Sequence, residues 1–316
     1  MKGTVVIALG GNALIRPGQT GRLEELTANA LAMAESVRDL VESDWRVVLV
    51  HGNGPQVGNL SYQQEDSAAS LPPLPLFLLD AMTQGEIGSL LSLALRSVLK
   101  GRRDVVTVLT HVVVDPGDDA FRHPTKPIGP FFEAARAEEL ASARGWTLVN
   151  DAGRGIRRVV ASPQPQRIVE IAPIRALVDQ GCLVISCGGG GIPVATTGDS
   201  LVGVDAVIDK DLAAERLATD LHADALAMVT EVSHVALDWG TPRARNIEEM
   251  SASEATAFAR QGQFPPGSMG PKVTAGLRFL RRGGGLVVIT SPDHLREAIE
   301  GRHGTRMVRD RSVAVA

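Results

Sequence analysis

The sequence predicts an α/β fold class: a three-layer α/β/α sandwich with a mainly parallel central sheet and a protruding subdomain. Three observations support this prediction. Short, almost continuously apolar segments recur along the chain, which is typical of strands covered on both faces. Amphipathic segments alternate with them, and strand–helix–strand alternation favours a parallel sheet between two helical layers. One stretch rich in Pro, Gly and Arg, about residues 115–165, interrupts the alternation and is interpreted as the protruding subdomain.

The individual elements follow from composition and periodicity. Buried strands are expected at Thr4–Leu9, Arg46–Val50, Asp104–Val114, Leu183–Ser186, Ala225–Val229 and Leu286–Thr290. Helices are expected at Leu23–Val41, Gly85–Leu99, Phe131–Arg144, Asp211–Leu221 and Pro271–Arg281. Prolines in the apolar segment Leu71–Phe77 exclude a regular helix, so we expect a loop there, either packed on the protein or in contact with another subunit.

The composition is that of an ordinary globular protein. Of its 316 residues, 44% are hydrophobic and 22% charged, which excludes collagen-like, low-complexity and disordered classes. No apolar run approaches the roughly 18 residues of a membrane span and no signal peptide is recognised, so we expect a cytoplasmic protein. We predict one domain over 1–316, with an N-terminal lobe 1–180 that carries the subdomain and a C-terminal lobe 181–316.

Cysteine content and net charge exclude several kinds of site. Cys182 and Cys187 are too few for a disulfide framework or a four-ligand zinc site, and buried apolar roles are favoured over metal or redox roles. A formal net charge of −4 gives no reason to expect a nucleic acid or an anionic membrane. We therefore expect neither as a partner.

Lysine is rare in this chain. Of its 32 basic residues only Lys2, Lys100, Lys126, Lys210 and Lys272 are lysines, so arginine meets most of the need for surface cations. A lysine present against that bias is a candidate for a role that needs a compact ammonium on a flexible stem. The last three stand among Pro, Asp or Gly residues, and they are the candidate functional cations.

Two predicted strands end in similar turns. The turns are Gly10-Gly11-Asn12 and Gly52-Asn53-Gly54. Glycines let the backbone turn tightly and bring its amides close to an anion. Ligands of open α/β sheets lie beyond the carboxyl ends of the strands, so both turns are expected to face one small anionic ligand. Neither turn is a dinucleotide fingerprint, and the chain has no Walker A sequence. His51, before the second turn, is either a buried hydrogen-bonded residue or a ligand contact.

A third glycine turn, Gly188–Gly191, follows the Leu183–Ser186 strand. Such a run can be a flexible linker, but its position directly after a buried strand favours a ligand loop. The basic segment Asp151–Arg158 also has two interpretations, a ligand-facing patch or a solvated surface.

Each candidate lysine has its own local context. Lys210 lies between Asp209 and Asp211 at a predicted helix start. These residues have two interpretations: a solvated ion pair, or an arrangement in which an aspartate orients two lysine ammonium groups. Lys272 follows a glycine turn at another helix N-terminus, where free amides and a cation together suit phosphate. Prolines on both sides fix the backbone around Lys126.

Three glycine turns and three positioned lysines indicate phosphoryl transfer. The sequence shows no metal-ligand cluster, nucleophile elbow or Ser-His-Asp set. Phosphoryl transfer needs little covalent chemistry from the protein, but it needs cations and amides around the transferring group. Mg²⁺, brought by ATP or ADP, is the expected cofactor.

Eight segments carry a family resemblance. They are Val6–Leu14, His51–Gly58, Asp80–Gly85, Pro124–Phe131, Asp151–Arg158, Gly188–Val194, Gly203–Leu212 and Gly267–Val273. In order, and over essentially the whole chain, they resemble the carbamate kinases of the amino acid kinase superfamily. The motif GGN alone would indicate only the superfamily, whereas DAMTQG, PTKPIGP and GSMGPK together indicate carbamate kinases.

The resemblance implies a homodimer that catalyses carbamoyl phosphate + ADP = carbamate + ATP, running toward ATP in arginine catabolism. Carbamate or carbamoyl phosphate would bind in the N-terminal half and MgATP or MgADP in the C-terminal half. The residues implied for catalysis are Lys126, Lys210, Asp211, Lys272, Gly10, Gly11 and Asn12. Those implied for carbamate are Gly52, Asn53 and Gly54, and those implied for the nucleotide are Gly188, Gly189, Asp209, Met269 and Gly270. None is implied as a metal ligand.

Two positions depart from the family pattern, and other functions stay open. Ile156 stands where an aromatic residue is expected and Ala161 where proline is expected, which puts details of the subdomain and substrate in question. One alternative is a relative that phosphorylates another small carboxylate, such as an acylated amino acid. Another is a non-catalytic metabolite sensor. A dinucleotide-dependent oxidoreductase is disfavoured because the fingerprint is missing.

Overall fold

An eight-stranded sheet forms the centre of the computed structural model, which describes residues 2–10, 14–16, 18–150 and 155–310. The strand order is β15-β17-β16-β12-β1-β2-β9-β3. The strands are β1 (Gly3–Leu9), β2 (Trp45–His51), β3 (Val105–Thr107), β9 (Leu183–Ile185), β12 (Ala225–Val229), β15 (Glu249–Ser251), β16 (Leu286–Thr290) and β17 (Thr305–Val308). All neighbouring pairs are parallel except β16 and β17. The predicted fold class is confirmed.

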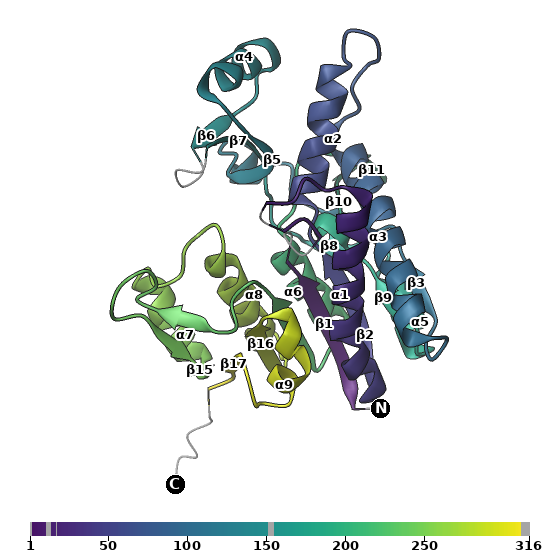
Figure 1. The fold of residues 1–316 in the computed structure, drawn as a ribbon, viewed down its shortest axis with the longest axis vertical. Helices are drawn as coiled ribbons and strands as arrows, with labels where there is room; N and C mark the ends of the chain where they lie inside the picture. The colour runs from purple at the N-terminus through teal and green to yellow at the C-terminus, as the bar shows by residue number, and fades with distance from the viewer. Residues whose placement is uncertain (1, 11–13, 17, 151–154, 311–316) are drawn as a thin grey trace.

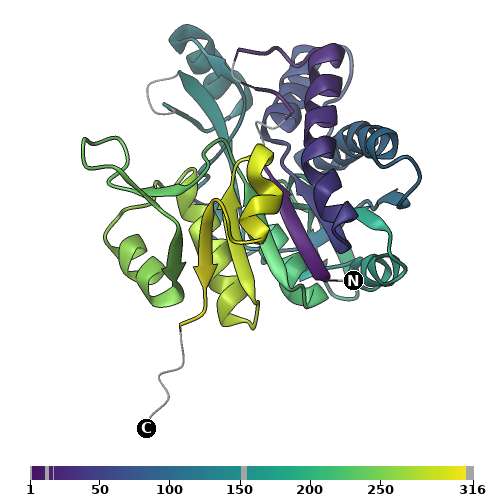
Figure 2. The same cartoon turned by 60° about the horizontal axis from the view of Figure 1, so that its bottom comes forward.

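Helices cover both faces of this sheet (Figures 1 and 2). One face carries α1 (Leu23–Glu42), α3 (Leu76–Leu99) and α9 (Leu295–Ile299), and the other carries α5 (Ile171–Asp179), α6 (Lys210–Leu221) and α8 (Met269–Arg281). Alternate side chains of β1, such as Ile7 and Ala8, enter the two separate cores. A further helix, α7 (Ala252–Arg260), packs on α8. No helix in the described residues is long and apolar enough to cross a membrane.

Three smaller sheets complete the described part of the chain, with strand orders β11-β10-β4-β8, β5-β7-β6 and β13-β14. Their strands are β4 (His111–Val113), β5 (Lys126–Phe132), β6 (Leu148–Asn150), β7 (Ile156–Val160), β8 (Arg167–Ile168), β10 (Ile192–Thr197), β11 (Ser200–Gly203), β13 (Val235–Leu237) and β14 (Arg245–Ile247). The remaining helices are α2 (Gly54–Asp66) and α4 (Ala134–Arg144), and short 3₁₀ turns occur at Asp119–Phe121, Gly188–Gly190 and Pro292–His294.

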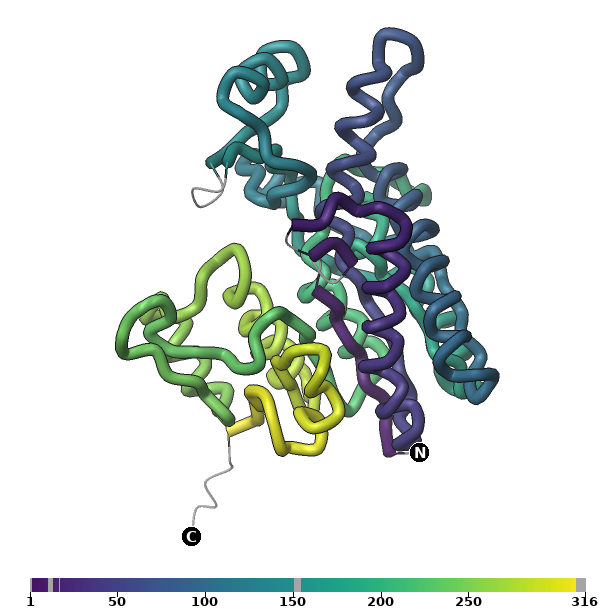
Figure 3. Tube along the Cα trace, in the orientation of Figure 1, coloured from purple at the N-terminus to yellow at the C-terminus, as the bar shows by residue number. Residues whose placement is uncertain are grey.

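The three-stranded sheet and α4 protrude from the body of the molecule (Figures 1 and 3). They share a small apolar core around Trp146. The contact with the body runs through α2, where a Cβ on Gly58 would lie only 1.9 Å from the backbone nitrogen of Gly129 in β5. Glycine at this crossing lets two backbones touch, which anchors β5 and its first residue, Lys126, on α2.

One predicted strand is divided in two. Asp104–Val114 forms β3 in the main sheet and β4 in the four-stranded sheet. Between them, the N–H of Thr110 donates to Oε1 of Gln84 at 2.8 Å instead of to a neighbouring strand. A side chain from α3 therefore ends the first pairing and redirects the chain.

Two predicted boundaries also differ. The sequence predicts a loop over Leu71–Phe77 and a helix only from Gly85, but α3 begins at Leu76. Its N-cap is Pro75, because proline disfavours a helix interior but is tolerated at a helix start. The helix expected over Phe131–Arg144 begins only at Ala134, since the residues up to Phe132 belong to β5.

The main sheet is continuous across the predicted lobe boundary. β9 follows residue 180 in the sequence, yet it lies between β2 and β3. The division into lobes 1–180 and 181–316 stays a prediction.

Candidate active site

The predicted ligand loops gather at the carboxyl edge of the main sheet. β1 and β2 pair in parallel with Leu9 opposite His51, so Gly10 and Gly52 leave the sheet side by side. β9 pairs with β2 and leads into the glycine run that begins at Gly188. Because ligands of open α/β sheets bind beyond this edge, the arrangement favours one shared ligand region.

Two lysines and one aspartate form a buried ion cluster at the N-termini of α6 and α8. Lys210 Nζ lies 2.6 Å from Asp211 Oδ1, and Lys272 Nζ lies 3.0 Å from Asp211 Oδ2. The two lysine side chains are each 10% exposed and the Asp211 side chain is 5% exposed, so solvent screens these charges little. We call Lys210, Asp211 and Lys272 the lysine–aspartate cluster.

Burial and the three close charges set the pKa values in this cluster. Burial, reinforced by the Lys272 ammonium, lowers the pKa of Lys210 to about 8 against the attraction of Asp211. Burial by itself raises the pKa of Asp211, but the two ammonium groups outweigh it and hold that pKa below its ordinary value. Burial also disfavours charge on Lys272, but Asp211 raises the Lys272 pKa above its ordinary value. At neutral pH the cluster is therefore net positive and suits an anion.

Lys126 reaches the same region from the protruding subdomain. Its Nζ lies 2.6 Å from Oδ2 of Asp209. Asp209 is the N-cap of α6, and its Oδ1 accepts the backbone N–H of Asp211 at 2.9 Å. Burial by itself raises the pKa of Asp209, but Lys126 outweighs burial and holds that pKa below its ordinary value. One ion pair thus connects the subdomain to the start of α6.

Asn53 precedes α2 and is only 2% exposed. Its Nδ2 donates to Asp80 Oδ1 at 2.8 Å and to Thr83 Oγ1 at 2.9 Å, both on α3. Burial raises the pKa of Asp80 well above its ordinary value, opposed by the hydrogen bond from Asn53. The next residue, Gly54, approaches β5, since a Cβ on it would lie 3.9 Å from the carbonyl oxygen of Pro127.

The glycine run packs between Asn53 and the segment that leads into α6. A Cβ on Gly189 would lie 2.3 Å from Asn53 Nδ2, and one on Gly190 would lie 2.3 Å from the carbonyl oxygen of Ile208. Both glycines have positive φ values, so side chains are disfavoured for two reasons. The run is a close-packed connection rather than a flexible linker.

His51 is a buried residue whose ring packs against the same run. A Cβ on Gly188 would lie 2.3 Å from His51 Nε2, and His51 Nδ1 lies 3.2 Å from the carbonyl oxygen of Gly52. Burial lowers the pKa of His51 to about 4, so the ring is neutral at physiological pH. A nucleotide role for Gly188 and Gly189 stays a prediction, because their observed neighbours are His51 and Asn53.

The other predicted site residues divide into two groups. Met269 and Gly270 share the first turn of α8 with Lys272, although the N–H of Gly270 already donates to a carbonyl in the preceding loop at 2.8 Å. Gly11 and Asn12 lie outside the described residues, as do the first four residues of the basic segment 151–158.

The two cysteines and the metal-ligating side chains are further candidates for functional groups in the described part of the chain. Cys187 is buried, Cys182 is half-buried, and neither is in a disulfide. Burial raises the pKa of the Cys187 thiol, which disfavours a thiolate. Within the described ranges, no group of three His, Cys, Asp or Glu residues is placed to hold a metal ion.

Three polar residues of α3 belong to this region although no sequence motif assigns them a role. They are Asp80, Thr83 and Gln84, and all three are buried. Gln84 Nε2 donates to the carbonyl oxygens of Thr110 at 3.1 Å and Gly188 at 3.0 Å. Polar residues at positions i, i+3 and i+4 of an otherwise apolar helix share one face, and that spacing was the signal available in the sequence.

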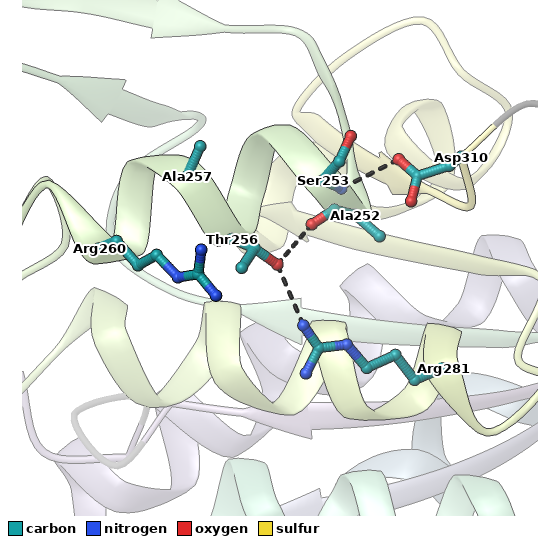
Figure 4. A pocket seen from close by; sticks show the side chains of 7 residues that line it. All are labelled: Ala252, Ser253, Thr256, Ala257, Arg260, Arg281 and Asp310. Atoms are coloured by element: carbon teal, nitrogen blue, oxygen red, sulfur yellow. Dashed lines mark hydrogen bonds between the residues drawn. The ribbon is translucent and has the colours of Figure 1, made fainter.

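A surface pocket of about 320 Å³ lies elsewhere, between α7 and α8 (Figure 4). Its lining residues are Ala252, Ser253, Thr256, Ala257, Arg260, Arg281 and Asp310. Arg281 reaches across it to donate to Thr256 Oγ1 at 3.1 Å. None of the predicted site residues lines this pocket.

Sequence comparisons place the chain among known kinases. The model of the amino acid kinase family matches residues 3–291. The carbamate kinase of Thermococcus kodakarensis is 44% identical over 312 residues, which cover 97% of this chain and 99% of that protein. The carbamate kinase-like protein YahI of Escherichia coli is 45% identical over 317 residues, covering 98% of this chain and all of that protein.

Solved structures give the same relationship. The carbamate kinase from Giardia lamblia bound to AMP-PNP matches with a TM-score of 0.90 at 41% identity, covering 98% of this chain and 99% of that chain. The same Giardia enzyme bound to citric acid matches with a TM-score of 0.93, at the same identity and coverage.

Proposed function

The chain belongs to the amino acid kinase family, its function is that of a carbamate kinase, and we propose that it transfers the phosphoryl group at the lysine–aspartate cluster. The reaction interconverts carbamoyl phosphate and ADP with carbamate and ATP. The observation that carries the site proposal is the pair of ammonium groups, Lys210 and Lys272, at 2.6 and 3.0 Å from the two oxygens of one buried carboxylate. A transferring phosphoryl group requires such a preorganised positive centre.

The cluster stabilises the charge that moves during transfer. In the ATP-forming direction, an oxygen of the ADP β-phosphate attacks the phosphorus of carbamoyl phosphate. The new P–O bond forms as the bond to the carbamate oxygen breaks, and the electron pair leaves with carbamate. Negative charge spreads over the equatorial oxygens, where Lys210 and Lys272 neutralise it. Asp211 accepts hydrogen bonds from both ammonium groups and so fixes them before the substrates arrive.

Carbamate and nucleotide would approach this cluster from opposite sides. We assign the carbamate side to Gly52, Asn53 and Gly54, with Lys126 above them from β5. We assign the nucleotide side to the first turns of α6 and α8, at Asp209, Met269 and Gly270, with Gly188 and Gly189 packed between the two sides. The backbone amides of Gly10, Gly11 and Asn12 would bind the transferring phosphoryl group, because Gly10 leaves β1 beside Gly52.

Mg²⁺ fits this site as an ion carried by the nucleotide. The nearby carboxylates of Asp209 and Asp211 already form ion pairs with lysines at 2.6 to 3.0 Å. They are therefore poorly placed to bind the metal ion directly. Mg²⁺ commonly keeps several waters and binds through substrate phosphates. When bound, it would supply positive charge to the phosphate groups of the nucleotide.

We further propose that the physiological direction forms ATP. Carbamoyl phosphate is a mixed anhydride, and such anhydrides donate their phosphoryl group readily to ADP. This direction fits a cytoplasmic enzyme of arginine catabolism.

The surface beside α3 supports a homodimer. Leu78 and Met82 are 37% and 44% exposed and lie one turn apart on α3, while Leu201 and Val202 are 44% and 50% exposed on β11. The end of β11 touches the first turn of α3, since a Cβ on Gly203 would lie 2.4 Å from the ring of Phe77. Exposed apolar side chains therefore occur on two neighbouring elements, which is typical of a contact surface. Light scattering is expected to give twice the 33.4 kDa chain mass, and a monomer would refute the proposal.

A donor panel tests the function. With MgADP, carbamoyl phosphate is expected to give the highest kcat/KM among carbamoyl phosphate, acetyl phosphate and acylated amino acid phosphates. Faster transfer from an acylated amino acid phosphate would leave only the family assignment. Binding of the ligands without ATP formation would indicate a metabolite sensor.

A further inference from the structure

The carboxamide of Asn53 has one orientation that satisfies its neighbours. Nδ2 contacts both Asp80 Oδ1 and Thr83 Oγ1, at 2.8 and 2.9 Å. The Thr83 hydroxyl donates its single proton to the carbonyl oxygen of Asp80 at 2.8 Å, so it can only accept from Asn53. The atom that faces α3 must therefore be the nitrogen, and both of its protons are used.

The oxygen of the same carboxamide faces the opposite way. Asn53 Oδ1 has no hydrogen-bond partner among the described residues. It is also not fully buried, so a small ligand can reach it. Gly189 packs against this carboxamide, where a Cβ would lie 2.3 Å from Nδ2 and 2.9 Å from Oδ1. On one side the glycine run leads to Ile208, two residues before Lys210, and on the other side Gly54 approaches β5 near Lys126.

We infer that Asn53 Oδ1 accepts a hydrogen bond from the substrate's amino group, and that Thr83 and Asp80 are positioning residues that keep it turned toward the substrate. The inference rests on the proposed function and names how that site selects its substrate. Carbamate and carbamoyl phosphate present an NH₂ group, whereas acetate and acetyl phosphate present a methyl group in its place. A fixed acceptor pairs with the first and is left unpaired by the second, and buried polar groups left unpaired give strong discrimination.

The Thr83 hydroxyl can be removed without changing side-chain shape. Thr83→Val deletes one of the two acceptors of Asn53 Nδ2, so Asp80 alone holds the carboxamide and its oxygen is fixed less firmly toward the substrate. We expect the ratio of kcat/KM for carbamoyl phosphate to that for acetyl phosphate to fall about tenfold or more. Where acetyl phosphate gives no measurable transfer, its inhibition constant against carbamoyl phosphate replaces its kcat/KM. Thr83→Ser retains the hydroxyl and is expected to keep the wild-type ratio.

Asn53→Ala removes the acceptor Oδ1 completely, and it replaces Thr83→Val in the experiment if that variant does not fold. It is expected to lower the same ratio by at least as much. A wild-type ratio in Asn53→Ala, or an equal loss with both donors in Thr83→Val, would overturn the inference and make the network purely structural. Failure of the wild-type protein to form ATP from carbamoyl phosphate would instead overturn the proposed function.

Discussion

Replacing Asp211 with asparagine tests whether one carboxylate makes two buried ammonium groups tolerable. The Asp211 side chain is 5% exposed, and its oxygens lie 2.6 and 3.0 Å from Lys210 and Lys272. Removing one partner of a buried ion pair costs about 3–5 kcal/mol because the remaining charge is uncompensated. Here two like charges remain side by side. We therefore expect Asp211→Asn to lower the free energy of unfolding by about 3–5 kcal/mol near pH 7.

The loss should depend on pH through Lys210. Its wild-type pKa of about 8, against an ordinary 10.5, already costs the protonated form roughly 3 kcal/mol. Without Asp211 this pKa falls further. At pH values between the pKa of Lys210 in the folded protein and its higher pKa in the unfolded chain, the unfolded chain binds more protons. The free energy of unfolding therefore rises with pH in this range. That rise begins at a lower pH in the variant. The difference from wild type therefore shrinks as the pH approaches 8 from below.

Urea unfolding at pH 6, 7 and 8 measures both effects, with Asp209→Asn as the matched control. Asparagine remains a good N-cap for α6, and the Lys126 partner of Asp209 is 26% exposed, so the control is expected to lose about 1 kcal/mol or less. If Asp211→Asn lost no more than the control at pH 7, the cluster would not depend on its carboxylate and the reasoning would be wrong.

Three further predictions follow from the same contacts. Lys210→Met and Lys272→Met are each expected to lower kcat by about 10²–10⁴ with the fold intact, because a preorganised cation acts mainly in the transition state; near-normal kcat, with circular dichroism as the fold control, would remove that lysine from the mechanism. In the wild type, kcat/KM for carbamoyl phosphate should fall as the pH rises through about 8, where Lys210 loses its proton; a pH profile that stays flat well above that point contradicts this. Lys126→Ala should weaken the apparent affinity for carbamoyl phosphate and lower kcat while MgADP affinity stays nearly unchanged, because Lys126 belongs to the protruding subdomain. Nucleotide titration and limited proteolysis with and without carbamoyl phosphate check this. Equal ligand protection of variant and wild type would show that Lys126 does not hold the protruding subdomain against the bound substrate.

The layers of the fold and the class of chemistry can be inferred from the amino-acid sequence alone. Apolar runs such as Thr4–Leu9 and Ala225–Val229 became central strands, because a parallel strand buried on both faces must be apolar along its length. The rarity of lysine singled out Lys126, Lys210 and Lys272, and all three lie in ion pairs at the start of α6.

Which side chains contact one another at the site depends on the tertiary packing. Lys126 is 83 residues from Asp209, and Lys272 is 61 residues from Asp211, so no local pattern encodes these pairs. The orientation of Asn53 likewise depends on α3, since Thr83 lies 30 residues further along the chain. Periodicity reports which face of an element is buried, whereas contacts between elements arise from the packing of the whole core.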